Sequence, residues 1–354
     1  MFAATVLVIG GAVVGASIAL QNPPAGNAVQ ATPAGHWKSF QLPPIDSGLA
    51  AVSCPTATYC VAVDYGGNWF VSSDPNAGSR TWKLESGVRS TPVPPREVMT
   101  ALSCIGSRCF AVDESGYLTM ATNLHGGGQE FDTVLANPYA DLTGISCPTP
   151  TLCVAVGVGS NYPRPTGILF AFSFPGAWSG NSAPTVLNSA YGLTAISCPT
   201  VHFCAATDEA GNIITTTDPA GGSGAWHVSK IHGADSFTAI SCPTVHFCAA
   251  VDSDGQVVTS TDPAGGASAW TITTLAGSVQ FDSVSCPTAS FCVTGGLSDS
   301  VFVSTHPTGG PAAWTRQRAM FLGLEPMSSL SCPSTRFCVG VDGGDANVSS
   351  NPIG

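Results

Sequence analysis

The sequence predicts an all-β protein, a seven-bladed β-propeller in which each blade is a four-stranded antiparallel sheet. The first observation is a unit that recurs seven times along the 354 residues, marked by cysteine pairs whose first members lie 43 to 51 residues apart. The second is that residues 241–275, the clearest copy, contain four short alternating runs separated by turn residues, without a helical period. A repeat of about 40–50 residues with four strands is typical of β-propellers, which usually have about 4–8 blades.

Each predicted strand of the clearest copy has its own signal. The first two strands flank the turn between Cys242 and Cys248, and the second ends at Asp252. An Asp-Gly turn leads into the third strand, over residues 256–260. A corner rich in glycine and proline follows, and Trp270 begins the fourth strand.

The two ends of the chain are expected to build one blade between them. The last unit has its cysteine pair and three strand signals, but the chain ends before a tryptophan strand. Residues 34–42, which include Trp37, resemble the strand that Trp270 begins. We therefore expect this N-terminal strand to complete the seventh blade and close the ring, which removes the exposed edges of an open array.

The segment before the ring divides into two parts. Residues 1–20 are apolar and contain no charged residue, and their length is near the roughly 20 residues that span a membrane. A cleaved signal peptide and a retained membrane anchor both fit this run, and either one exports the ring. Residues 21–33 are predicted to be a flexible linker, and residues 34–354 to form the propeller. The expected location is extracellular, or anchored in the membrane and facing the exterior.

Composition limits the partners. The net charge is −11, only 9% of residues are charged, and there are three lysines. Nucleic-acid binding needs a basic face, so we exclude it. We expect a monomer without a cofactor.

The fourteen cysteines are expected to form one disulfide per blade, because each pair brackets the turn between the first two strands. Structural zinc sites usually take four ligands, which pairs on different blades could not share. The expected pairs are Cys54–Cys60, Cys104–Cys109, Cys147–Cys153, Cys198–Cys204, Cys242–Cys248, Cys286–Cys292 and Cys332–Cys338. We predict no metal site.

The corner before each tryptophan has a recurring pattern of Ser or Thr, Asp, Gly and Trp. It is found at Ser72, Asp74, Gly78 and Trp82; at Thr216, Asp218, Gly222 and Trp226; and at Ser260, Asp262, Gly266 and Trp270. This pattern resembles the Asp-box (BNR) repeat of sialidase-like propellers, with more residues between the aspartate and the tryptophan than that family has. In that family the box is structural and lies away from the ligand. We expect the carboxylate to cap its turn and the tryptophan to fill the space between blades.

Antiparallel order places the disulfide turns and the Asp boxes on one face, and the strand two–three turns and blade-to-blade connections on the other. Five of these two–three turns begin with an aspartate: Asp64, Asp113, Asp208, Asp252 and Asp342. These carboxylates either cap their turns or form an acidic ring that could hold a cation. Blade three instead carries an insertion with Tyr162 and Arg164. We take these seven residues as candidate ligand-binding residues.

The function expected is binding without catalysis. The arginine motif of sialidases is absent, as are the zinc-protease, serine-hydrolase and phosphate-loop motifs. We therefore predict an exported propeller that binds a protein or a glycan. The alternative is a diverged sialidase-like glycoside hydrolase, which would need two carboxylates at a set separation.

Overall fold

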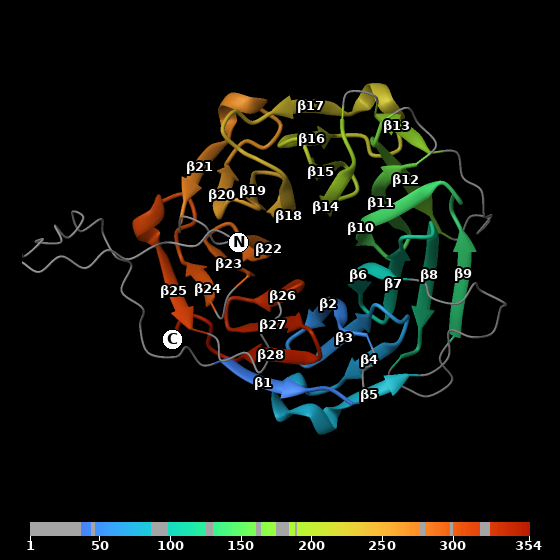
Figure 1. Cartoon of the computed structure of the whole chain (residues 1–354), viewed down its shortest axis with the longest axis vertical. Coiled ribbons are helices and arrows are strands. Elements are labelled where there is room, and N and C mark those ends of the chain that lie inside the picture. The colour runs from blue at the N-terminus through green and yellow to red at the C-terminus, as the bar shows by residue number, and fades with distance from the viewer. Residues whose placement is uncertain are drawn as a thin grey trace, which may run out of the picture.

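The computed structural model describes residues 37–43, 47–85, 98–124, 130–160, 164–174, 184–187, 190–275, 280–297, 300–318 and 326–354. These residues form seven four-stranded antiparallel sheets arranged in a ring (Figure 1). Short 3₁₀ turns are present, and the described residues contain no α-helix. The predicted all-β, seven-bladed fold is therefore confirmed.

Each blade runs from an inner strand at the centre of the ring to an outer strand at its rim (Figure 1). Blade 1 has β2 (Leu49–Thr56), β3 (Tyr59–Asp64), β4 (Trp69–Ser72) and β5 (Trp82–Glu85). Blade 2 has β6 (Met99–Ile105), β7 (Arg108–Asp113), β8 (Tyr117–Thr122) and β9 (Glu130–Leu135). Blade 3 has β10 (Ala140–Thr149), β11 (Leu152–Gly159), β12 (Thr166–Ser173) and β13 (Thr185–Leu187).

The remaining blades repeat this order. Blade 4 has β14 (Leu193–Thr200), β15 (Phe203–Asp208), β16 (Asn212–Thr216) and β17 (His227–Lys230). Blade 5 has β18 (Phe237–Thr244), β19 (Phe247–Asp252), β20 (Gln256–Ser260) and β21 (Thr271–Thr274). Blade 6 has β22 (Phe281–Thr288), β23 (Phe291–Gly296), β24 (Ser300–Ser304) and β25 (Trp314–Arg318). Blade 7 has β26 (Ser329–Ser334), β27 (Phe337–Asp342), β28 (Asp345–Ser349) and β1 (Trp37–Gln41). The 3₁₀ turns are η1 (Pro75–Ala77), η2 (Ser79–Thr81), η3 (Ser223–Ala225), η4 (Ala267–Ala269) and η5 (Pro311–Ala313).

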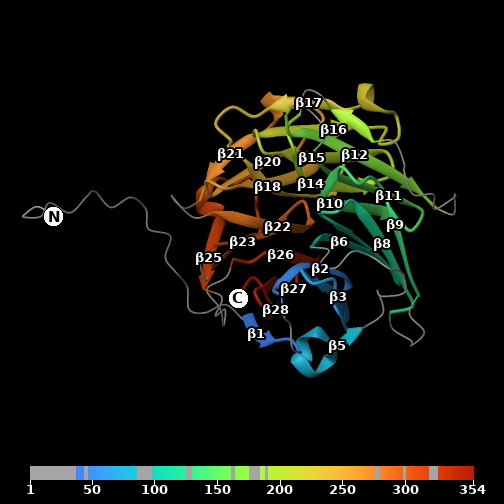
Figure 2. The same cartoon turned by 45° about the vertical axis from the view of Figure 1, so that its right-hand side comes forward.

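Blade 7 takes its outer strand from the N-terminal part of the chain. β1 pairs antiparallel with β28, with Trp37 opposite Ser349 and Gln41 opposite Asp345, and the two strands lie side by side in both views (Figures 1 and 2). The buried amide of Gln317 in blade 6 contacts both segments. Its Oε1 accepts a hydrogen bond from the Trp37 indole at 3.3 Å, and its Nε2 donates to the carbonyl of Pro352 at 2.7 Å. One side chain thus binds the N-terminal and C-terminal segments to the neighbouring blade.

All fourteen cysteines form the seven predicted disulfides, one in each blade. Every disulfide joins the inner strand of a blade to the second strand, with the two Cα atoms 4.0 to 4.1 Å apart. Such a set of disulfides indicates an oxidising environment, because intracellular thiols are usually kept reduced.

A complete circle of seven hydrogen bonds joins the inner strands. In each inner strand, the hydroxyl of the serine that precedes the first cysteine accepts a hydrogen bond from the backbone N–H of the equivalent cysteine in the next blade. The bonds are Ser53 to Cys104, Ser103 to Cys147, Ser146 to Cys198, Ser197 to Cys242, Ser241 to Cys286, Ser285 to Cys332 and Ser331 to Cys54, at 2.9 to 3.1 Å. Each bond gives a partner to an N–H group at the free inner edge of a sheet, which an edge strand otherwise leaves unpaired.

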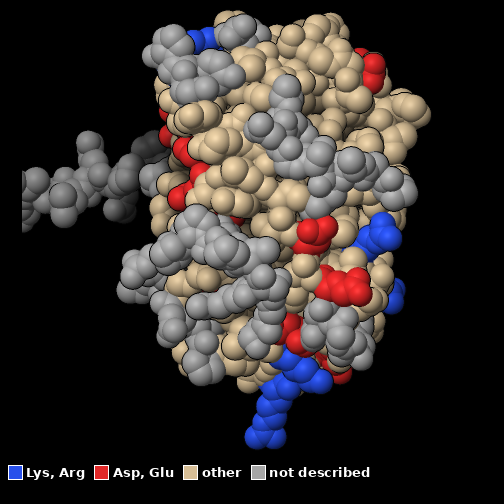
Figure 3. Space-filling model, turned by 90° about the vertical axis from the view of Figure 1, so that its right-hand side faces the viewer, with Lys and Arg blue, Asp and Glu red and all other residues tan. Residues whose placement is uncertain are grey.

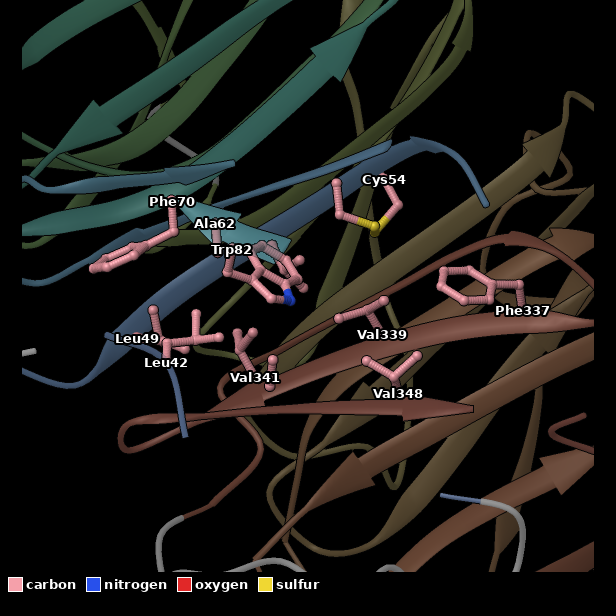
Figure 4. Close-up of a cluster of buried hydrophobic side chains, with 13 residues drawn as sticks. Leu42, Leu49, Cys54, Ala62, Phe70, Trp82, Phe337, Val339, Val341 and Val348 are labelled. Carbon is pink, nitrogen blue, oxygen red and sulfur yellow. A yellow bond between two sulfur atoms is a disulfide. The ribbon is translucent and has the colours of Figure 1, made fainter. Parts of the chain in front are cut away.

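The hydrophobic core lies between blades. In the cluster drawn in Figure 4, Val339 and Val341 of blade 7 pack with Phe70 and Trp82 of blade 1. The Trp82 side chain is only 2% exposed. Tryptophan therefore fills the space between neighbouring blades here, as expected from the sequence, and burial of such a ring is a large apolar contribution to stability.

The described residues include no helix long and apolar enough to cross a membrane. Residues 1–20, predicted to be a signal peptide or anchor, and the predicted linker at 21–33 lie outside the described residues.

We predict that Ser241→Ala lowers the free energy of unfolding by about 1 kcal/mol, because it removes one bond of the inner circle and leaves the Cys286 N–H without its acceptor. Chemical denaturation measures this change. The control is Ser268→Ala in the same blade, at an exposed position, where the expected change is within about 0.5 kcal/mol. Equal stability of the two variants would contradict the role given to the serine.

Candidate functional site

The two faces of the ring differ in construction. The disulfide turns and the Asp boxes lie on one side, which we call the disulfide face, and the strand two–three turns and blade-to-blade connections lie on the other, which we call the Asp-turn face. On the Asp-turn face, backbone hydrogen bonds join the blade-to-blade connections to the strand two–three turns. Ser160 N–H donates to the Tyr139 carbonyl at 2.9 Å, and Glu209 N–H donates to the Gly192 carbonyl at 3.1 Å. At these two places the irregular segments of the face are held on a rigid scaffold, where binding residues are often found.

The five predicted aspartates are all buried on the Asp-turn face. Asp64, Asp113, Asp208, Asp252 and Asp342 are each 0 to 1% exposed. In the first four, Oδ1 accepts hydrogen bonds from the backbone N–H groups two and four residues later, at 2.8 to 3.1 Å. These carboxylates cap their turns, which is one of the two roles considered from the sequence.

Asp208 shows the most complete set of these contacts. Besides the two turn N–H groups, its Oδ2 accepts the side-chain amide of Asn212 at 2.6 Å and the N–H of Tyr191 at 3.0 Å. One carboxylate thus holds both its own turn and the connection that arrives from blade 3. The buried Asp208 side chain therefore fixes the backbone of two surface segments of the Asp-turn face.

Two blades lack the aspartate for a steric reason. Gly157 in blade 3 pairs with Leu142, and Gly296 in blade 6 pairs with Phe281, at the register position where Asp64 pairs with Leu49 in blade 1. A Cβ atom at Gly157 would lie 2.1 Å from the carbonyl oxygen of Asp141, and one at Gly296 would lie 2.2 Å from that of Gln280. The backbone at the entry to the inner strand lies too close for a side chain at either position.

A ligand-binding role for the five aspartates stays a prediction. Their burial directs them to the turns, and the described residues contain no group of three or more His, Cys, Asp or Glu side chains that could hold a metal ion.

We predict that Asp208→Ala lowers the free energy of unfolding by about 3 kcal/mol or more, because it leaves several buried N–H groups without an acceptor. Thermal or chemical denaturation tests this. Asp218→Ala, an exposed Asp-box position in the same blade, is the control and should change stability by no more than about 0.5 kcal/mol. An Asp208→Ala variant with the stability of the wild type would show that the carboxylate does not hold the turn.

The blade-three insertion is described in part. Arg164 is exposed, and its guanidinium carbon lies 4.8 Å from the centre of the Tyr191 ring, a cation–π contact. Tyr162 lies outside the described residues. The role predicted for Tyr162 with Arg164 stays a prediction, and the aromatic contact that the structure describes for Arg164 is with Tyr191.

Sequence reasoning missed the exposed aromatic residues of the connections. Tyr139 is 55% exposed, Tyr191 45% and Tyr65 42%. Tyr139 and Tyr191 lie within three residues of the start of the next inner strand, and Tyr65 directly follows Asp64. The sequence feature that could have predicted them is a tyrosine next to turn-forming residues, outside the alternating apolar pattern of a strand.

The Asp boxes lie on the disulfide face and act through their hydroxyl and tryptophan residues. Oγ1 of Thr216 and Oγ of Ser260 accept the backbone N–H of the box aspartate two residues later, both at 3.0 Å. The aspartate itself is exposed, and the Asp74 side chain makes no capping hydrogen bond to η1. The expectation that this carboxylate caps its turn is therefore wrong for Asp74. The hydroxyl of the Ser or Thr two residues before the aspartate is the group that forms the hydrogen bond of the corner.

One half-buried carboxylate on the Asp-turn side, that of Asp282, is poorly satisfied. Asp282 is the second residue of the inner strand of blade 6, at the position where blade 5 has Thr238, whose hydroxyl donates to the Phe281 carbonyl at 2.7 Å. Burial raises the pKa of the Asp282 carboxyl, and a hydrogen bond from Gln280 only partly opposes this. Its Oδ2 is buried and has no hydrogen-bond partner within the described part of the chain.

We predict that Asp282→Asn stabilises the protein at neutral pH. Because the folded-state pKa lies above the ordinary value of 3.8, the folded state holds the proton more tightly, and the wild type loses stability as pH rises through the folded-state pKa. Asparagine removes this cost, so its melting temperature should exceed that of the wild type at pH 7. Below pH 3.8 the difference should disappear. A variant less stable than the wild type at pH 7 would contradict this.

Comparison with known proteins supports the fold. No family model matches the chain, and no curated protein sequence matches it. Solved structures with a similar fold include YCF48 bound to D1 peptide, with 13% sequence identity, a TM-score of 0.68, and coverage of 92% of this chain and 100% of that one. The RRP9 WD40 repeats are 11% identical with a TM-score of 0.66, covering 91% and 99% of the two chains. U3-55K is 11% identical with a TM-score of 0.64, covering 88% and 98%.

The chain therefore belongs to the class of seven-bladed β-propellers. At these identities the likeness shows the fold alone. The resemblance to Asp-box proteins stays a prediction, because no family model matches.

Proposed function

We propose that this chain is an exported, non-catalytic propeller that binds a protein or glycan ligand on its Asp-turn face, outside the cell or at its surface. The seven disulfides support export, with residues 1–20 as the signal or anchor and residues 21–33 as a linker to the ring. The rigid ring positions irregular connections, which is a common arrangement for binding surfaces.

The observation that carries the proposal is the position of the exposed large apolar side chains. Among the residues that the structure describes, six such side chains are more than 40% exposed. Four of them belong to turns and connections of the Asp-turn face, namely Tyr65, Tyr139, Tyr191 and Leu297. Tyrosine is enriched at protein interfaces, where it combines an apolar ring with a polar tip. These side chains favour a protein ligand over a glycan.

The solved structure of YCF48 with D1 peptide supports the same reading, because that similar propeller is bound to a peptide. The rim of the ring at blades 2 and 3 is a separate surface, and most of its described part is neither acidic nor basic (Figure 3).

The test is a screen of the purified chain against peptide and glycan arrays and a panel of fluorogenic glycosides. We expect peptide binding without glycoside turnover. In the variant Tyr139→Ser with Tyr191→Ser, affinity for the ligand should fall about tenfold or more, because exposed tyrosines at an interface often contribute over 1 kcal/mol each.

The matched control changes the two exposed apolar residues that lie elsewhere, Leu84→Ser with Ile353→Ser, and should keep the affinity. If the ligand failed to bind the control variant but bound the tyrosine variant with wild-type affinity, the assignment of binding to the Asp-turn face would be wrong. Turnover of a glycoside would favour the hydrolase alternative.

A further inference from the structure

The disulfide of blade 2, between Cys104 and Cys109, differs from the other six in its exposure. In each of the other blades the first cysteine is buried, with 4 to 7% of its surface exposed. Cys104 is half-buried instead, while Cys109 is completely buried, as is the second cysteine of every blade. A molecule that approaches from the solvent therefore meets this disulfide from the side of Cys104.

The turn that this disulfide closes is also different. The two cysteines are five residues apart in blade 2 and six apart in the other blades, as in blade 1. In the longer turns the strand register shifts around the first cysteine, for example between Ser53 and Thr56. In blade 2, Cys104 and Cys109 are direct partners in a regular ladder, and Gly106 takes the turn with a φ of 59°. Blade 2 thus lacks the irregular backbone that surrounds the first cysteine elsewhere.

The junction between blades 1 and 2, where this disulfide packs, is less completely buried than its equivalents. In blade 1, Trp82 lies in the same cross-strand row as the disulfide, and in blade 2 the place of that tryptophan is taken by Phe131. Three positions of blade 2 are half-buried while their blade 1 equivalents are buried: Leu102, Cys104 and Phe131 against Val52, Cys54 and Trp82. The three half-buried side chains pack against one cluster, which also contains Cys109. The disulfide is therefore shielded from solvent less well than its equivalents.

The charge of the blade 2 turn favours the approach of an anion. Residues 105–108 contain no carboxylate, and their one ionisable side chain is the exposed Arg108. Its Nη1 donates to the Pro150 carbonyl of blade 3 at 3.3 Å, and Arg108 directly precedes Cys109 in the chain. The nucleophile in thiol–disulfide exchange is a thiolate, so a neighbouring cation favours its approach.

We propose that Cys104–Cys109 is a reactive disulfide, and that Cys104 is a site of reversible modification by a low-molecular-weight thiol of the glutathione class. The thiolate attacks Sγ of Cys104 and forms a new S–S bond, while the bond between Cys104 and Cys109 breaks. The electron pair of the broken bond leaves on Sγ of Cys109, which takes a proton from water. One disulfide replaces another, so the step needs no oxidant. Attack of the Cys109 thiolate on the mixed disulfide restores the original bond and releases the thiol.

The site is selective because exposed disulfides exchange with thiols more readily than buried ones. The other six disulfides are buried at both cysteines and are expected to stay intact. The reactive disulfide lies at the disulfide-face end of blade 2, so the inference is independent of the ligand proposed for the Asp-turn face.

The experiment treats the full chain under native conditions with reduced glutathione, alkylates the free thiols, and maps all cysteines by mass spectrometry without reduction. We expect glutathione on Cys104 and the alkyl group on Cys109, formed at least about tenfold faster than modification of any other pair. Removal of the glutathione after the reaction should restore the original disulfide.

Two matched variants complete the test. Cys104→Ser with Cys109→Ser should abolish the rapid uptake of glutathione, measured by intact mass, while Cys242→Ser with Cys248→Ser should keep it. Should the first variant fail to fold, the map of the wild type decides. The inference would be overturned by an absence of uptake, by an adduct on Cys109, or by another pair that reacts as fast. Simultaneous reaction of all seven disulfides would overturn it too, because that result indicates reaction through the unfolded state.

Discussion

A hydrogen bond from each first-cysteine N–H to a serine hydroxyl of the preceding blade is the contact on which the ring depends. It occurs at all seven junctions, including the one from Ser331 to Cys54 that joins the end of the chain to its beginning. The disulfide of each blade then fixes the same cysteine to the second strand. Of these two adjacent residues, the serine connects neighbouring blades and the cysteine connects two strands of one blade.

This arrangement leaves the two faces with different freedom. The disulfide face repeats a similar disulfide turn in every blade, one residue shorter in blade 2, so these turns offer little that distinguishes one blade from another. On the Asp-turn face, a buried carboxylate such as Asp208 holds the turn and the incoming connection from beneath, which leaves the outer side chains free to differ. Tyr139 and Tyr191 are exposed there because the backbone that carries them is held by its neighbours. The features that distinguish one blade from another therefore lie mainly on this face.

The repeat made much of the fold predictable from sequence. Cysteine spacing indicated the seven blades and the disulfides, because each pair stands across a short turn. The role of the serine before each cysteine could not be seen, since it depends on the distance between blades. Sequence also left two roles open for Asp64 and its equivalents, and only the hydrogen bonds of four of them showed that these carboxylates cap turns. The exposed tyrosines were missed because exposure of a connection depends on what it packs against. Gly157 was seen as a departure, but its cause, the nearby Asp141 carbonyl, is purely three-dimensional.

The most direct test of this account is residue-resolved amide hydrogen exchange in Ser331→Ala. Removing this hydroxyl should accelerate exchange of the Cys54 N–H about fivefold or more, as the loss of about 1 kcal/mol of local protection requires, while the Cys242 N–H, bonded to Ser197, keeps its wild-type rate. Unchanged exchange at Cys54, or equal acceleration at both cysteines, would contradict the claim that each serine individually holds one junction of the ring.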